Sequence, residues 1–264
     1  MKTLLLPLLL FVSSVCYSQL DDKFYQPGKI MKPITAVSYT EFSIPVEKDT
    51  ITGIFMNPKD KAKATFLFFH GSGGNVSTYA FMTQPLIEAG YQVLMVDFRG
   101  YGKSTGQPTH QNIQHDGQKF LDYALQMKEL AGKKVILYGA SMGSQIATNL
   151  AKNNGKSIHA LVLDGTISSL NDVAIHFAPQ QEAFLKSISF PYSAKEDIKG
   201  VTLPTLFIHS EKDIMIPYQQ GRMVYDNAPG PKVFLNYDGP HLEAMVHNKA
   251  RVIEKIDALL QLSK

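Results

Sequence analysis

Gly139-Ala140-Ser141-Met142-Gly143 is the stretch of sequence that decides the fold. It follows an apolar run, residues 134–138, and precedes residues 144–150, which have the composition of a helix. The pattern G-x-S-x-G between a strand and a helix is typical of a tight turn that lifts the serine hydroxyl above a sheet. The two glycines let strand and helix come close, and the helix N-terminus favours a developing negative charge. Ser141 is therefore the candidate nucleophile.

Around this turn, near-continuous apolar runs alternate with helical stretches. The predicted strands are residues 64–69, 91–96, 134–138, 160–163, 205–209 and 232–237, and the predicted helices are 78–89, 113–130, 142–152, 218–227 and 241–262. Strands that are apolar throughout are typical of a parallel sheet buried under helices on both faces. Residues 38–46 and 50–57 flank the polar residues 47–49 and predict an antiparallel hairpin. The sequence thus predicts an α/β fold, with a mostly parallel sheet, an antiparallel N-terminal hairpin and helices on both faces.

Two further side chains are expected beside Ser141. A serine hydroxyl is a weak nucleophile until a base takes its proton. Asp213 follows strand 205–209 and His241 follows strand 232–237, and right-handed crossovers bring these strand ends to one edge of the sheet. The order serine, acid, histidine predicts a triad in which Asp213 orients His241. Asp164, at the end of strand 160–163, is the alternative acid.

Four motifs in this order resemble the α/β-hydrolase superfamily, and more narrowly its small, lid-poor serine-aminopeptidase-like or dienelactone-hydrolase-like members. They are residues 69–75 (FHGSGGN), residues 97–104 (DFRGYGKS), the turn around Ser141, and the loops of the acid and the histidine. The resemblance covers residue 38 to the C-terminus. It implies an oxyanion hole formed by the backbone N–H groups of Ser72 and Met142. The sequence departs from the family pattern at Pro240, where the family usually has glycine before the histidine.

The resemblance also assigns a structural role to residues 97–104, with Asp97 and Arg99 as internal partners. Residues 167–201 are longer than a usual connection between a strand and a helix, and they carry many apolar side chains. This stretch could form a small lid over the site, or it could pack on the sheet as a pair of short helices. Its apolar residues favour an acyl chain of modest length as the substrate.

The function that the resemblance implies is that of a serine hydrolase. It would cleave a carboxylic ester, or a related acyl bond, of a small-molecule substrate through an acyl-enzyme intermediate, with no cofactor and no metal. An acylaminopeptidase-like or thioesterase activity stays open, because the fold does not fix the substrate. A catalytically inactive hydrolase-fold module that binds a ligand or partner is the alternative from another class.

The N-terminal residues predict export. Lys2 precedes a short apolar stretch, and the small residues Cys16 and Ser18 fit a cut before Gln19. We therefore expect a signal peptide at residues 1–18, an extended lead-in at 19–37 and the hydrolase domain at 38–264. The apolar stretch is too short to span a bilayer, so the mature chain is expected to lack a transmembrane segment and to be periplasmic or secreted. Lipid attachment at Cys16 is the alternative.

The composition excludes several other classes of protein. A chain of 264 residues, 44% hydrophobic and 19% charged, is typical of one globular α/β domain. The net charge of +3 comes from scattered lysines without a basic, aromatic-rich run, which argues against nucleic-acid binding. The remaining histidines show no metal-ligand spacing, and neither a dinucleotide fingerprint nor a P-loop is present. Nothing in the sequence indicates the oligomeric state.

Overall fold

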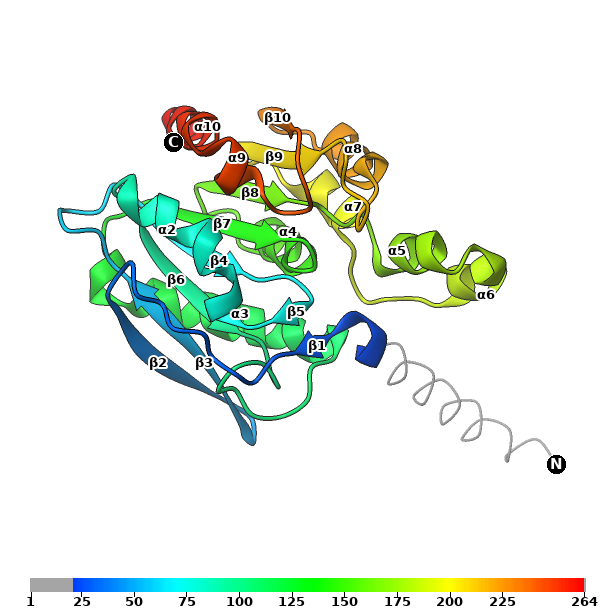
Figure 1. Cartoon of the computed structure of the whole chain (residues 1–264), viewed down its shortest axis with the longest axis horizontal. Helices are drawn as coiled ribbons and strands as arrows, with labels where there is room; N and C mark the ends of the chain where they lie inside the picture. Colours follow the sequence, from blue (N-terminus) through cyan, green and yellow to red (C-terminus); the bar gives the residue numbers. More distant parts are fainter. Residues whose placement is uncertain (1–20, 264) are drawn as a thin grey trace.

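An eight-stranded sheet forms the centre of the molecule (Figure 1), as the computed structural model of residues 21–263 shows. The predicted signal peptide, its cleavage site and Cys16 lie outside the described residues. The strands are β2 (Tyr39–Val46), β3 (Asp49–Met56), β4 (Thr65–Phe69), β6 (Gln92–Asp97), β7 (Val135–Ala140), β8 (Ala160–Asp164), β9 (Thr205–Ser210) and β10 (Lys232–Tyr237). Their order across the sheet is β10-β9-β8-β7-β4-β6-β3-β2.

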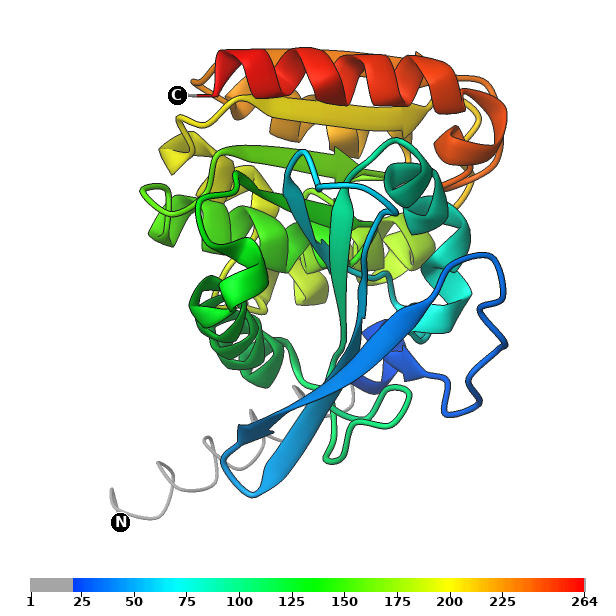
Figure 2. The same cartoon turned by 90° about the vertical axis from the view of Figure 1, so that its left-hand side faces the viewer.

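The sheet is parallel from β10 to β6, and the N-terminal hairpin is its antiparallel part. β2 pairs with β3 in the antiparallel sense, and β3 joins the rest of the sheet by antiparallel pairing with β6. Figure 2 shows the strand direction turning across the sheet, from the yellow β9 to the steeply inclined blue hairpin. The predicted α/β fold, including its antiparallel hairpin, is confirmed.

Helices cover both faces of the sheet. One face carries α3 (His110–Gln126), α4 (Gly143–Asn153), α7 (Ala194–Asp197) and α8 (Tyr218–Asn227), and the other carries α2 (Ala80–Glu88), α9 (Ala244–His247) and α10 (Lys249–Leu262). β7 shows how one strand serves two cores, because Leu137 packs with the α4 side and Ile136 and Tyr138 with the α2 side. All six of its residues are buried, which explains why its sequence is apolar throughout.

The C-terminal helix begins later than predicted. The stretch 241–262 was expected to be one helix, but residues 240–243 form a loop and the helical part divides into α9 and α10 around Asn248. The hydroxyl of Tyr237 holds this loop, donating to the carbonyl of Pro240 at 2.6 Å and accepting from the N–H of Glu243 at 3.0 Å. The loop keeps His241 outside the helix and free to lie at the sheet edge.

The stretch 167–201 contains several short helices. They are α5 (Leu170–Phe177), η3 (Pro179–Gln181), α6 (Glu182–Ser187), α7 and η4 (Ile198–Gly200). Figure 1 shows α5 and α6 projecting beyond the strand ends, whereas α7 lies against the body of the protein. Leu185 is buried, while Phe177 and Phe184 are 60% and 51% exposed. Across residues 21–263, no helix is long and apolar enough to cross a membrane.

Candidate active site

The turn between β7 and α4 holds Ser141 in a strained backbone conformation. Its φ is 52°, a left-handed value that is uncommon for a residue with a side chain. A Cβ at Gly143 would lie 2.0 Å from the carbonyl oxygen of Phe69, and one at Gly139 would lie 2.7 Å from the carbonyl oxygen of Gly143. The backbone N–H of Ser141 donates to the carbonyl of Asp164 at 2.8 Å. The two glycines are thus required by close backbone contacts, and the turn is tied to the neighbouring strand.

Asp213 and His241 are hydrogen-bonded to each other. His241 Nδ1 lies 2.5 Å from Asp213 Oδ2. The other carboxylate oxygen, Oδ1, accepts the backbone N–H groups of Met215 at 2.9 Å and Ile216 at 2.8 Å. Burial alone would raise the pKa of Asp213, but hydrogen bonds from His209, His241 and Ile216 lower it well below its usual range. Asp213 is therefore a carboxylate that can hold the Nδ1–H tautomer of His241 and leave Nε2 free to accept a proton.

Asp164, the alternative acid, has a different partner. Its Oδ2 accepts the hydroxyl of Tyr138 at 2.8 Å, and its Oδ1 has no hydrogen-bond partner among the described residues. Burial raises the pKa of Asp164 to about 6, although the Tyr138 hydroxyl and nearby His241 lower it. The structure therefore brings His241 to Asp213 and leaves Asp164 beside it, paired with a tyrosine.

The loop after β4 approaches Ser141 closely. A Cβ at Gly71 would lie 3.3 Å from Ser141 Cβ. Within residues 21–263, no acceptor is found for the backbone N–H of either Ser72 or Met142. Met142 stands at the N-terminus of α4, where backbone N–H groups lack helical partners. Both predicted oxyanion donors are thus unengaged and lie on the two segments that flank Ser141.

His70 fixes the peptide plane that ends in the Ser72 N–H. It is completely buried, and burial lowers its pKa to about 4, so the ring is neutral at physiological pH. Its Nδ1 lies 2.7 Å from the carbonyl oxygen of Gly71, and its Nε2 lies 3.4 Å from the backbone nitrogen of Phe98. A neutral ring satisfies both contacts only if Nδ1–H donates and Nε2 accepts. This tautomer holds the Gly71 carbonyl, and with it the orientation of the adjoining N–H.

Residues 97–104 are buried except for Lys103, and Asp97 and Arg99 each have a separate partner. The Arg99 guanidinium binds both carboxylate oxygens of Asp116, at 2.7 and 2.8 Å, and reaches Glu47 at 3.0 Å. Asp97 accepts the backbone N–H of Val76 at 2.8 Å. Burial raises the pKa of Asp97 to about 7, partly offset by that N–H. These contacts fasten the loop after β6 to its surroundings.

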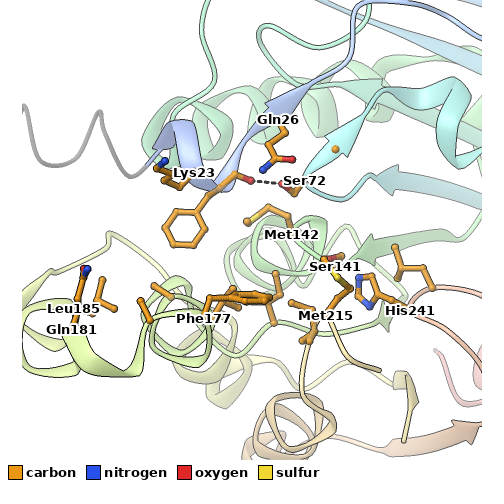
Figure 3. Close-up of a pocket in the computed structure, with 18 of the residues that line it drawn as sticks. Lys23, Gln26, Ser72, Ser141, Met142, Phe177, Gln181, Leu185, Met215 and His241 are labelled. Carbon is orange, nitrogen blue, oxygen red and sulfur yellow. Dashed lines mark hydrogen bonds between the residues drawn. The ribbon is translucent and has the colours of Figure 1, made fainter. Parts of the chain in front are cut away.

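A cavity of about 740 Å³ opens above Ser141. Ser141 and His241 lie at one end, and Gln181 and Leu185 lie at the other (Figure 3). Its walls are mostly apolar and come from the N-terminal segment, from α5 and α6, and from the loop that carries Asp213. The apolar side chains are Phe24, Met142, Ile167, Val173, Ala174, Phe177, Ala178, Leu185, Met215, Ile216 and Leu242. Such a space suits an apolar chain whose reactive carbonyl lies at Ser141.

Two contributions to the site were not predicted from the sequence. One is His209, to which the sequence assigned no role: its Nε2 lies 3.5 Å from Asp213 Oδ2 and 3.0 Å from the carbonyl oxygen of Ile216. Its place at the end of β9, four residues before Asp213, is the signal that could have indicated this contact. The second is the N-terminal segment, where Phe24 and Gln26 line the cavity. This contact involves too few residues to produce a periodic pattern in the sequence. Among residues 21–263 no cluster of His, Cys, Asp or Glu could hold a metal ion.

Comparison with known proteins agrees with this architecture. A family model described as alpha/beta hydrolase fold matches residues 64–189. The uncharacterized protein YfhR of Escherichia coli K12 is 31% identical over 231 residues, which cover 85% of this chain and 78% of that protein. The chain belongs to the α/β-hydrolase superfamily. The proteins that it resembles include a lipase and an esterase.

The lipase is the lysophosphatidylserine lipase ABHD12 of Danio rerio. It is 27% identical over 187 residues, covering 63% of this chain and 47% of that protein. The esterase is Pf2001 of Pyrococcus furiosus, whose solved structure superimposes with a TM-score of 0.73 at 18% identity. The superposition covers 90% of this chain and 99% of that one, and at this identity it establishes a shared fold.

Proposed function

We propose that this α/β-hydrolase is a serine esterase that cleaves carboxylic esters of apolar acyl chains. The observation that carries the proposal is the hydrogen bond of 2.5 Å between His241 and Asp213, at a cavity that Ser141 also lines. A histidine held by a buried carboxylate beside a serine is the arrangement that activates a hydroxyl for acyl transfer. The unengaged N–H groups of Ser72 and Met142 would supply the oxyanion hole.

In the first half of the reaction, Ser141 forms the acyl-enzyme. His241 Nε2 takes the proton from Ser141 Oγ as Oγ bonds to the ester carbonyl carbon. The carbonyl oxygen becomes negative and accepts hydrogen bonds from the Ser72 and Met142 N–H groups, each worth about 3 kcal/mol of barrier. Asp213 stabilises the imidazolium. The C–O bond to the alcohol then breaks, and His241 returns the proton to the departing alkoxide.

In the second half, water releases the acid. His241 takes a proton from a water molecule as its oxygen bonds to the acyl carbon, and the same two N–H groups hold the negative oxygen. The bond from carbon to Ser141 Oγ breaks, and His241 gives its proton back to Oγ. Neither half changes any oxidation state; the reaction consumes the ester and one water molecule, and the triad is restored.

The apolar walls of the cavity support an acyl chain as the bound portion of the substrate. Esters need less help for the leaving group than amides do, which favours ester over peptide cleavage. The Danio rerio relative is a lysophosphatidylserine lipase, an activity that is also of the ester class. Thioester and acylaminopeptide cleavage use the same steps and differ in the leaving group. Export across a membrane remains part of this proposal, with Gln19 as the first residue of the mature chain.

An acyl-chain series tests where the chain binds. Ala174, on α5, lines the cavity, whereas Ala183, on α6, is exposed and does not. We expect Ala174→Trp to fill the space and lower kcat/KM for p-nitrophenyl octanoate by about 10-fold or more, with acetate changed less than about threefold. Ala183→Trp is the matched control and should leave both esters unchanged. Equal losses on both esters in Ala174→Trp would show that the acyl chain lies elsewhere.

A further inference from the structure

The N-terminal segment, residues 21–28, is fastened to the loop that carries Ser72. Ser72 Oγ donates to the carbonyl of Phe24 at 2.5 Å, across 48 residues of sequence, and this bond is drawn in Figure 3. The backbone N–H of Gln26 donates to the carbonyl of Ser72 at 3.0 Å. β1 (Gln26–Pro27) then pairs in parallel with β5 (Gly73–Gly74), as Figure 1 shows. The segment thus binds both the side chain and the backbone of Ser72.

The other end of the segment has an anchor of its own. The Asp21 carboxylate accepts the backbone N–H of His110 at 2.9 Å, at the start of α3. The Tyr25 hydroxyl lies 2.8 Å from Nδ1 of His110, whose Nε2 lies 3.3 Å from the carbonyl oxygen of Tyr192. Burial lowers the pKa of His110 to about 4, so the neutral ring accepts from Tyr25 and donates to Tyr192. These contacts fix the segment without using the Ser72 loop.

The Ser72 loop is rich in glycine and depends on contacts with several neighbouring segments. Residues 71, 73 and 74 are glycines, and glycine has the greatest backbone freedom to lose on folding. A Cβ at Gly73 would meet nothing within 4 Å, and the backbone of Gly73 is held by pairing with Gln26 and by the Tyr79 hydroxyl, which donates to its carbonyl at 3.0 Å. The Gly71 carbonyl is held by His70, and the Ser72 carbonyl also accepts the Tyr101 hydroxyl at 2.5 Å. To these contacts the segment adds the bond to the Ser72 hydroxyl and the backbone pairing at residues 72–74.

We propose that residues 21–28 are a positioning element for the oxyanion donor of Ser72, an inference that rests on the proposed esterase function. The loop lies between the segment and the nucleophile, since a Cβ at Gly71 would come within 3.3 Å of Ser141 Cβ. An oxyanion donor acts only when its N–H is aimed at the developing charge, and small misplacements are costly in rate. The same segment lines the substrate cavity with Phe24 and Gln26. It would therefore contact the acyl chain of the substrate and also hold the Ser72 N–H in place.

Two substitutions loosen the contact without removing any group of the triad or either oxyanion N–H. A Cβ at Gly28 would lie 2.9 Å from Gly74 Cα, so Gly28→Ala drives a methyl group between segment and loop. Ser72→Ala deletes only the hydroxyl that binds Phe24. Gly155→Ala is the matched control, because its nearest neighbour, the carbonyl oxygen of Ala151, would be at an ordinary 3.5 Å. Ser72→Ala keeps the test valid if Gly28→Ala does not fold.

The measurements are hydrogen–deuterium exchange of residues 70–75 and steady-state turnover of p-nitrophenyl butyrate, with thermal unfolding as the check on folding. We expect both variants to exchange faster at residues 70–75 and to lose about 10-fold in kcat, with KM changed less than about threefold. Gly155→Ala should match the wild type in both measurements. Unchanged exchange in the folded variants, or faster exchange with unchanged kcat, would overturn the inference. A wild-type protein that hydrolyses no ester would refute the proposed function instead, and exchange would still decide whether the segment orders the loop.

Discussion

Ser141→Ala is expected to lower ester turnover by about 10⁴-fold or more. Alanine has no oxygen to bond to the acyl carbon, so no acyl-enzyme can form. The fold should be unaffected, because no hydrogen bond from the Ser141 hydroxyl is found within residues 21–263 and alanine occupies a left-handed turn about as well as serine. Steady-state hydrolysis of p-nitrophenyl butyrate and thermal unfolding measure the two effects separately.

Ser187→Ala is the control for this substitution. Ser187 is exposed at the end of α6 and donates to the carbonyl of Phe184 at 2.7 Å, outside the cavity. Its replacement should leave kcat and KM unchanged. Turnover that survives in a folded, contaminant-free Ser141→Ala protein would mean that another group is the nucleophile.

Asp213→Asn is expected to lower kcat by about 10⁴-fold. The asparagine oxygen can still accept the N–H groups of Met215 and Ile216, so the loop should keep its shape. The amide nitrogen would then face His241 Nδ1 as a donor and favour the tautomer with the proton on Nε2. That tautomer cannot accept the proton of Ser141, so the loss falls on kcat.

Asp164→Asn is the matched control, since Asp164 is the other buried acid beside the site. We expect it to change kcat by less than about threefold, because the asparagine oxygen can still accept the Tyr138 hydroxyl. The substitution should also remove a pH-dependent loss of folding stability. The pKa of Asp164 is raised to about 6 in the folded protein, so stability is lost as pH rises from about 4 through 6. The uncharged amide removes that loss, and the variant should be no less stable than the wild type at pH 8. A larger loss of kcat in Asp164→Asn than in Asp213→Asn would make Asp164 the acid.

The central strands and the turn at Ser141 could be predicted because their signals are local. β4, β7 and β8 are buried on both faces and are therefore continuous apolar runs. Gly139 and Gly143 are required where the strand and helix backbones touch, so the five residues of the motif are enough to predict the turn. Asp213 and His241 follow from these elements, because the parallel topology sends the ends of β9 and β10 to the same edge.

Features that depend on long-range contacts could not be predicted. The pairing of Gln26 with Gly73 involves two residues on each side, too few for any alternating pattern. The prediction of a helix from residue 241 was wrong because the apolar periodicity continues through the loop. The hydroxyl of Tyr237 holds this loop by hydrogen bonds that no local sequence pattern indicates. Arg99 pairs with Asp116, on α3, and not with a residue of its own motif. The motif identified these side chains as structural, and only the folded arrangement identified their partners.

Labelling with a fluorophosphonate probe tests the central claim most directly, because the probe phosphonylates a serine that is activated as a nucleophile. The account predicts that the folded wild-type protein becomes covalently labelled, with the adduct on the tryptic peptide that contains Ser141, and that Ser141→Ala is not labelled. A folded wild-type protein that stays unlabelled at high probe concentration would contradict this and favour an inactive hydrolase-fold binding module. An adduct on another residue would contradict the assignment of Ser141 as the nucleophile.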